Sequence, residues 1–140
     1  MTSTYVTPSR LDRILSLPLA LPQTELRRGR SIQVAVLPLA LNESLEIKSL
    51  TLHLLKLLTP GQTPDLNNTA LGIVSVGIYL TPMLTGSAAL VRAYQPGATA
   101  LNPYSPARFT TPGAYTVIAS NNTANVDVAI IVTGLARWTR

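Results

Sequence analysis

The chain has 140 residues, no cysteine and a formal net charge of +5. A chain of this length forms one domain with a sizeable core, and the lack of cysteine excludes a disulfide framework and all thiolate chemistry. Charged residues make up only 12% of the chain, against about 25% in an average soluble domain, while 46% are apolar. This combination favours a surface that is covered by protein partners.

The positive charge raises the question of nucleic acid. Lysine and arginine clustered on one face bind phosphate groups. Nine of the eleven cations are arginine, and arginine is equally typical of desolvated protein contacts. We therefore favour a protein partner over nucleic acid.

The N-terminal segment is predicted to be extended. Its start, MTSTYVTPSRLDR, lacks the basic residues and uninterrupted apolar stretch of a secretory signal, so we expect no export by that route. Pro18 and Pro22 have no N–H group to donate to a sheet. Residues 1–30 are therefore predicted to be an edge strand or an arm, and residues 31–140 to be the sandwich domain.

Three arginines, Arg27, Arg28 and Arg30, stand immediately before the next predicted strand. Such a cluster keeps a strand edge from pairing with its copies. Alternatively, it forms a corner that binds an acidic partner surface. On the second interpretation the three arginines are candidate partner contacts.

Alternation of apolar and polar residues predicts strands along most of the chain. The first four lie at 31–41, 45–58, 70–80 and 88–95. Pro38 indicates an edge or a bulge. Residues 45–58 also fit one side of a helix, but their serine and threonine content and their β neighbours favour a strand. The charge-free stretch 66–91 is broken by glycine and proline, which predicts strand, turn and strand rather than a membrane helix.

Two connections are long and rich in proline, residues 59–69 and 96–112. Long loops in a compact domain tend to be functional. Tyr104, Arg108 and Phe109 lie in the second loop, and aromatic residues beside arginine are typical of interface anchors. The alternative is that the loop folds over the sandwich, with Tyr104 and Phe109 as plugs.

Residues 115–134 contain two alternating runs around a cluster of asparagines, which predicts a β-hairpin. In this hairpin Ile118 and Ile131 are neighbours on the outer face, which indicates that another layer of protein covers them, as at an oligomer interface. Trp138 lies between Arg137 and Arg140, and we expect it to dock onto a neighbour. The predicted buried face comprises Tyr115, Val117, Ala119, Val128, Ile130 and Val132.

No pattern of catalytic residues is visible. His53, the single histidine, lies among leucines and is predicted to be packed, and the six carboxylates are scattered. One histidine without cysteine makes no metal site. We therefore expect no enzyme, no cofactor and no metal.

The predicted fold is all-β, a β-sandwich of about eight strands of jelly-roll or Greek-key type. With its start MTSTY and its end GAYTVIASNNTANVDVAIIVTGLARWTR, the chain resembles the small structural proteins of tailed bacteriophages, particularly the capsid cement or decoration proteins of cyanophages. The resemblance covers the whole chain and lies in composition and sandwich type, without a diagnostic motif.

The resemblance implies a virion protein, made in the host cytoplasm, that forms a homotrimer or cluster at joints between major capsid proteins and reinforces the shell. It implies that the arginines at 27, 28 and 30, and the loop with Tyr104, Arg108 and Phe109, grip the major capsid protein. The alternative function is a carbohydrate-binding β-sandwich module of a phage fibre or surface protein. That module would need exposed aromatic side chains beside a groove.

Overall fold

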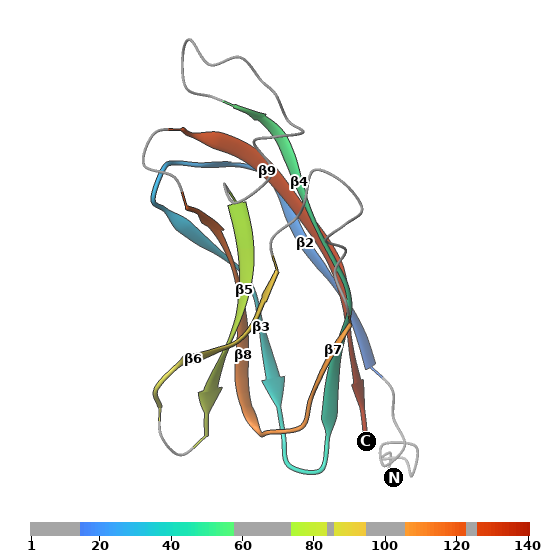
Figure 1. The fold of residues 1–140 in the computed structure, drawn as a ribbon. Helices are drawn as coiled ribbons and strands as arrows, with labels where there is room; N and C mark the ends of the chain where they lie inside the picture. The colour runs from blue at the N-terminus through green and yellow to red at the C-terminus, as the bar shows by residue number, and fades with distance from the viewer. Residues whose placement is uncertain (1–14, 58–73, 84–85, 95–105, 123–125) are drawn as a thin grey trace, which may run out of the picture.

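The computed structural model describes residues 15–57, 74–83, 86–94, 106–122 and 126–140. These residues form eight strands in two antiparallel four-stranded sheets, which we call sheet I (order β2-β9-β4-β7) and sheet II (order β3-β8-β5-β6) (Figure 1). The strands are β2 (Leu15–Leu26), β3 (Ser31–Leu39), β4 (Ser44–Leu57), β5 (Val74–Pro82), β6 (Ala89–Tyr94), β7 (Ala107–Phe109), β8 (Gly113–Asn121) and β9 (Val128–Thr139). The predicted all-β sandwich of eight strands is confirmed.

The strands pair in a nested pattern. The first described strand pairs with the last, β2 with β9, and inside that pair lie β3 with β8, β4 with β7 and β5 with β6. The pairs β4 with β9 and β5 with β8 complete the two sheets. Nested antiparallel pairing divided between two sheets is the topology of a jelly roll.

The predicted hairpin between β8 and β9 is wrong. β8 pairs with β3 and β5 in sheet II, whereas β9 pairs with β2 and β4 in sheet I. The six residues predicted to share a buried face are all at most 1% exposed, but they reach the core from opposite sheets. Alternation fixes which face of a strand is buried and leaves the choice of partner strand open.

β4 is a strand, as predicted. Its helix-like spacing has a local cause: Leu45 and Ile47 are buried, then Leu50 and Leu52, and the register against β9 shifts between Ile47 and Ser49. An extra residue in a strand moves the following buried positions by one. The resulting interval of three residues imitates a helical period.

The two strands with prolines in their interior, β2 and β3, lie at sheet edges. β3 is an edge of sheet II and has a bulge between Gln33 and Ala35, as Pro38 predicted. Leu15–Leu26 form β2, the edge strand of sheet I, with a bulge between Leu21 and Thr24. An edge tolerates proline because one row of its N–H groups has no partner strand.

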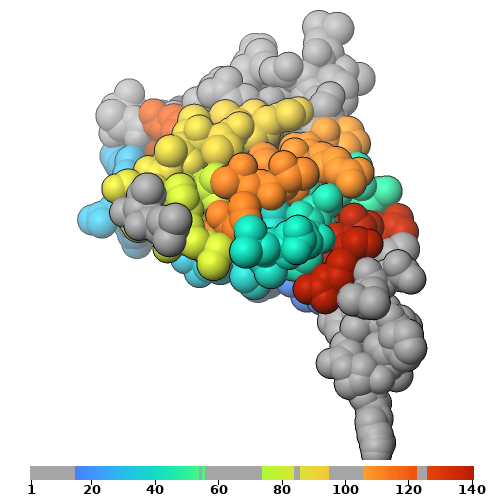
Figure 2. All heavy atoms as spheres, turned by 90° about the horizontal axis from the view of Figure 1, so that it is seen from below, coloured from blue at the N-terminus to red at the C-terminus, as the bar shows by residue number. Residues whose placement is uncertain are grey.

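The strand β7 lies in the stretch where prolines predicted mostly irregular chain. It pairs with the first residues of β4, at the end of the sandwich where the turn between β3 and β4 lies beside the start of β8 and the C-terminal end of β9 (Figures 1 and 2). Pairing of only three residues needs few N–H groups, so prolines on both sides do not prevent it.

The core lies between the two sheets and includes Trp138, which is 8% exposed. The Trp138 indole Nε1–H donates to the carbonyl oxygen of Pro38 at 2.8 Å, which links sheet I to the edge of sheet II. The tryptophan predicted to dock onto a neighbour is thus packed within its own sandwich. In the parts of the chain that the structure describes, no helix is long and apolar enough to cross a membrane.

Candidate interaction surfaces

A tight turn joins β2 to β3 and carries the three clustered arginines. The Arg30 backbone N–H donates to the carbonyl oxygen of Arg27 at 3.0 Å, and Gly29 has a φ of +70°. A positive φ at the third residue is what a type II turn requires, and glycine adopts it without steric cost. The sequence RRGR therefore specifies the turn as well as its charge.

Asp127, which immediately precedes β9, holds this turn in place. Its Oδ1 accepts the Arg28 backbone N–H at 2.9 Å and the Arg28 Nε–H at 3.1 Å, and its Oδ2 accepts from Arg28 Nη2 at 3.3 Å. These hydrogen bonds hold the pKa of Asp127 below its ordinary value and raise the pKa of Arg28. The Arg27 Nη1 lies 4.0 Å from the same carboxylate, with 74% of its side chain exposed.

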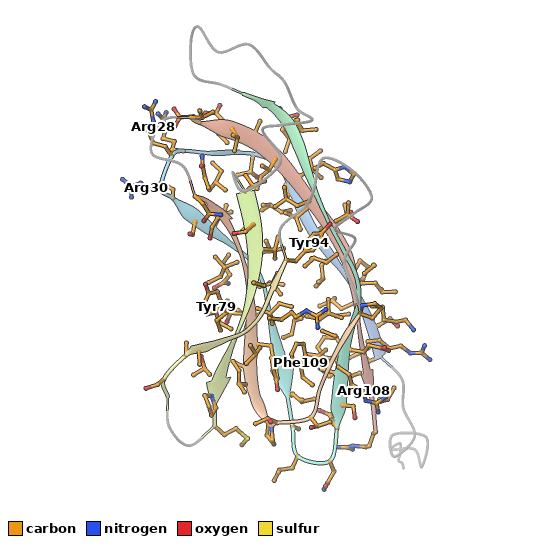
Figure 3. The ribbon with its side chains drawn as sticks, viewed as in Figure 1. Arg28, Arg30, Tyr79, Tyr94, Arg108 and Phe109 are labelled. Carbon is orange, nitrogen blue, oxygen red and sulfur yellow. The ribbon has the colours of Figure 1, made fainter. Side chains whose placement is uncertain are left out.

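The arginine turn rests on a buried asparagine. Asn121, which is 2% exposed, donates its side-chain N–H groups to the carbonyl oxygens of Leu26 at 3.0 Å and Val126 at 2.7 Å. Its backbone N–H donates to the carbonyl oxygen of Arg30 at 2.9 Å. We call the turn of residues 27–30, with Asp127 and Asn121, the arginine corner. Its three crossing segments are tied together, so Arg28 and Arg30 are presented on a fixed backbone (Figure 3).

The predicted contacts on β7 have different environments. The Arg108 side chain is exposed, and its Nη2 donates to Ser44 Oγ at 3.2 Å. Phe109 is half-buried against the core, with its ring centroid 4.7 Å from that of Tyr115 (Figure 3). Phe109 therefore packs against the core of its own sandwich, as the alternative interpretation of the loop predicted. Tyr104 lies outside the described residues.

The outer face of sheet II carries no charged side chain among the described residues. Strands β3, β5 and β8 contain no charged residue. The one charge in β6, Arg92, lies opposite the core residue Ile78 and therefore on the inner side of the sheet. We call this outer face the uncharged face, and its central residues are Gln33, Val36, Tyr79, Leu90, Thr116 and Ile118.

The uncharged face is also partly apolar. A Cβ added to Gly77 would lie 2.7 Å from the Tyr79 ring, so the ring lies directly over the glycine, on the side away from the core (Figure 3). On this face, the large apolar side chains of Val36 and Leu90 are 46% and 53% exposed. Exposed apolar side chains without charge are typical of the centre of a protein interface.

The outer face of sheet I is charged by comparison. It carries Glu46, with Lys48 at 3.7 Å, and the exposed Arg108 on the neighbouring strand. His53, predicted to be packed among leucines, is exposed on this face because it alternates with the buried Leu52. The two faces of the sandwich therefore differ in chemistry.

Ile118 and Ile131 are not neighbours. Each is half-buried in a central strand, but Ile118 lies on the outer face of sheet II and Ile131 on the outer face of sheet I. The homotrimer that the resemblance implies therefore gains no support from a contact between these two residues. The place of either residue at an oligomer interface stays a prediction.

Two features of these surfaces were not predicted from the sequence. Asp127 and Asn121 lie about a hundred positions from the arginines that they support, and no local pattern links them. The uncharged face had a visible signal in the sequence, since the predicted strands at 31–41 and 70–80 and the first run of the predicted hairpin, residues 115–121, contain no charged residue.

No protein-family model matches the chain, and no curated protein matches it. Within the described ranges, no group of three or more histidine, cysteine, aspartate or glutamate side chains could hold a metal ion. Two surfaces of the described structure are suited to binding, the arginine corner and the uncharged face.

Proposed function

We propose that the protein is a non-enzymatic virion component that binds across the joints between major capsid proteins and reinforces them. The nested strand pairing carries this proposal, because the jelly roll is an architecture of viral capsid domains. Lectins and cupins share the architecture, so a binding role has to be argued from surfaces.

The arginine corner supplies a grip on the shell. Arg28 is hydrogen-bonded to Asp127, the Arg27 side chain is 74% exposed and lies 4.0 Å from the same carboxylate, and Arg30 is exposed on the same turn. Guanidinium groups bind carboxylates through paired, charge-assisted hydrogen bonds. A turn that is already ordered loses little conformational entropy on binding, so this corner suits an acidic surface of a capsid subunit.

The proposed mechanism is mechanical and needs no turnover. A shell under internal pressure fails where its subunits meet, and a protein bound across the joint adds interface that must be broken first. A standard interface buries about 1,600 Å². Repetition around a symmetric shell, with several contacts for each assembly, raises the total avidity.

The test is co-sedimentation of the purified protein with empty shells of the encoding phage that lack it. The double variant Arg27→Glu/Arg30→Glu is expected to bind about tenfold or more weakly, since charge-assisted hydrogen bonds contribute roughly 1.5–3 kcal/mol each. Arg28 is left unchanged because it holds the fold of the corner. The control variant Lys48→Glu/Arg140→Glu changes the net charge equally and is expected to bind normally. Equal binding by all three proteins would remove the arginine corner from the proposal.

One observation favours a second candidate, a carbohydrate-binding module. The Tyr79 ring lies over Gly77 on an outer face that also carries Gln33 and Thr116, and an aromatic ring beside neutral hydrogen-bonding groups suits a sugar. In a glycan array, this candidate predicts binding that Tyr79→Ala abolishes and Arg27→Glu/Arg30→Glu leaves intact. Binding to shells without glycan binding would favour the capsid role.

A further inference from the structure

The uncharged face has no counterpart elsewhere on the described surface. Charges stand on the outer face of sheet I, at the arginine corner and at the turn between β3 and β4. Three strands of sheet II have none, although the chain carries a net charge of +5. Copies of a cationic protein repel one another least when they meet through such a face.

The polar groups of this face suit an identical surface. Ser31 and Ser120 share a hydrogen bond at 2.8 Å between their hydroxyl oxygens, and Asn122 donates to Ser75 Oγ at 2.9 Å. Hydroxyl and amide groups both donate and accept, so two copies of the same group can pair across a twofold axis. An ammonium or a carboxylate group near such an axis would instead face an identical charge on the other copy, and the two charges would repel each other.

The apolar groups and the area of the face point the same way. Val36 and Leu90 are about half exposed, and the Tyr79 ring lies over Gly77. Four strands about 4.8 Å apart and mostly nine residues long cover on the order of 500 Å² in each copy. The resulting total of about 1,000 Å² reaches the lower end of specific interfaces, which corresponds to weak association.

From the missing charge, the self-complementary polar groups and this area, we infer that the uncharged face binds a second copy of this chain, sheet II against sheet II, about a twofold axis. A twofold contact uses the same face of both copies and leaves neither face free, so the product is a dimer. The dimer places Ile118 in the contact and leaves Ile131 outside it. The inference stands independently of the capsid role.

The test is the mass of the full chain by light scattering and sedimentation over a concentration series from about 5 to 200 µM, the range in which an interface of this size associates. We expect the mass to rise from 15.0 kDa towards that of two chains. The face variant Val36→Lys/Leu90→Lys is expected to raise the dissociation constant at least tenfold. The matched control Leu15→Lys/Leu17→Lys changes side chains that are 44% and 43% exposed at the edge of sheet I and is expected to dimerise normally.

Circular dichroism melting checks that each variant is folded, and Thr116→Lys at the centre of the face serves as a second disrupting variant. A wild-type protein that stays at 15.0 kDa throughout would overturn the inference. Association that survives both face variants, or that the control abolishes, would overturn it as well. A monomer that binds glycans through Tyr79 would assign the face to sugar instead.

Discussion

Arg28 and Asp127 lie 99 residues apart in the chain and share three hydrogen bonds at one end of the sandwich. Arg28 lies in the crossover from sheet I to sheet II, between β2 and β3, and Asp127 lies in the crossover back, between β8 and β9. The pair therefore ties together two connections between the sheets. It also fixes the turn that presents Arg27 and Arg30.

This pair predicts a defined pH dependence of stability. The pKa of Asp127 is lowered in the folded protein, chiefly by hydrogen bonds from Arg28. A group with a lowered folded pKa contributes stability above its unfolded pKa, and this contribution disappears as the pH falls through the folded pKa. We expect Asp127→Asn to lower the urea midpoint at pH 7, and the difference from wild type to shrink below about pH 4. A difference that is equal at pH 7 and pH 3 would contradict this assignment.

Replacing Asn121 is expected to lower the free energy of unfolding more than replacing its exposed neighbour, Asn122. Asn121→Ala leaves the carbonyl oxygens of Leu26 and Val126 without their donor, which is expected to cost about 2–4 kcal/mol of unfolding free energy. Asn122→Ala, the matched control, loses only an exposed hydrogen bond to Ser75 and should cost about 0.5 kcal/mol or less. Urea denaturation at pH 7 measures both. Equal losses for the two variants would show that the buried amide is not what holds this corner.

Trp138 is expected to act through both packing and hydrogen bonding. Trp138→Phe keeps an aromatic ring in the core but removes the donor to the Pro38 carbonyl oxygen, and we expect a loss of about 1 kcal/mol. Trp138→Ala also opens a cavity and should cost about 3–5 kcal/mol. If thermal melts show no loss of stability for Trp138→Ala, the side chain is not packed as described. The prediction of an exposed tryptophan that binds a partner would then be favoured.

Gly134 is expected to tolerate no side chain. A Cβ at this position would lie 2.5 Å from the carbonyl oxygen of Ser49, at the bulge in β4. Because the obstructing atom belongs to the backbone, Gly134→Ala is expected to lower the unfolding free energy by about 1–3 kcal/mol. An unchanged denaturation midpoint would mean that the bulge moves aside at no cost.

The sequence predicted the class of fold because alternation survives in almost every strand. Val117 and Ile130 are buried as expected, yet each belongs to a different sheet, since the pattern records burial and not partners. The bulge in β4 shows a second limit, because one inserted residue made a strand resemble a helix.

The binding surfaces were less predictable for a related reason. The arginines were visible as a cluster, but Asp127 reaches them only through the jelly-roll topology. Trp138 was expected at a partner because of its charged neighbours, and its burial follows from its place opposite Leu45 in the register of β4 and β9. The positions of Asp127 and Trp138 both depend on which distant strands pair, and a local sequence pattern does not specify that pairing.

The most direct test of the proposed function is cryo-electron microscopy of particles of the phage that is proposed to encode the chain, with the copy number of the chain measured by mass spectrometry. If the protein has the proposed capsid role, we expect density for an eight-stranded jelly roll bound across joints between major capsid proteins, with the arginine corner against an acidic surface of the shell. Density for the jelly roll on a tail fibre, or absence of the chain from the particles, would contradict the capsid role.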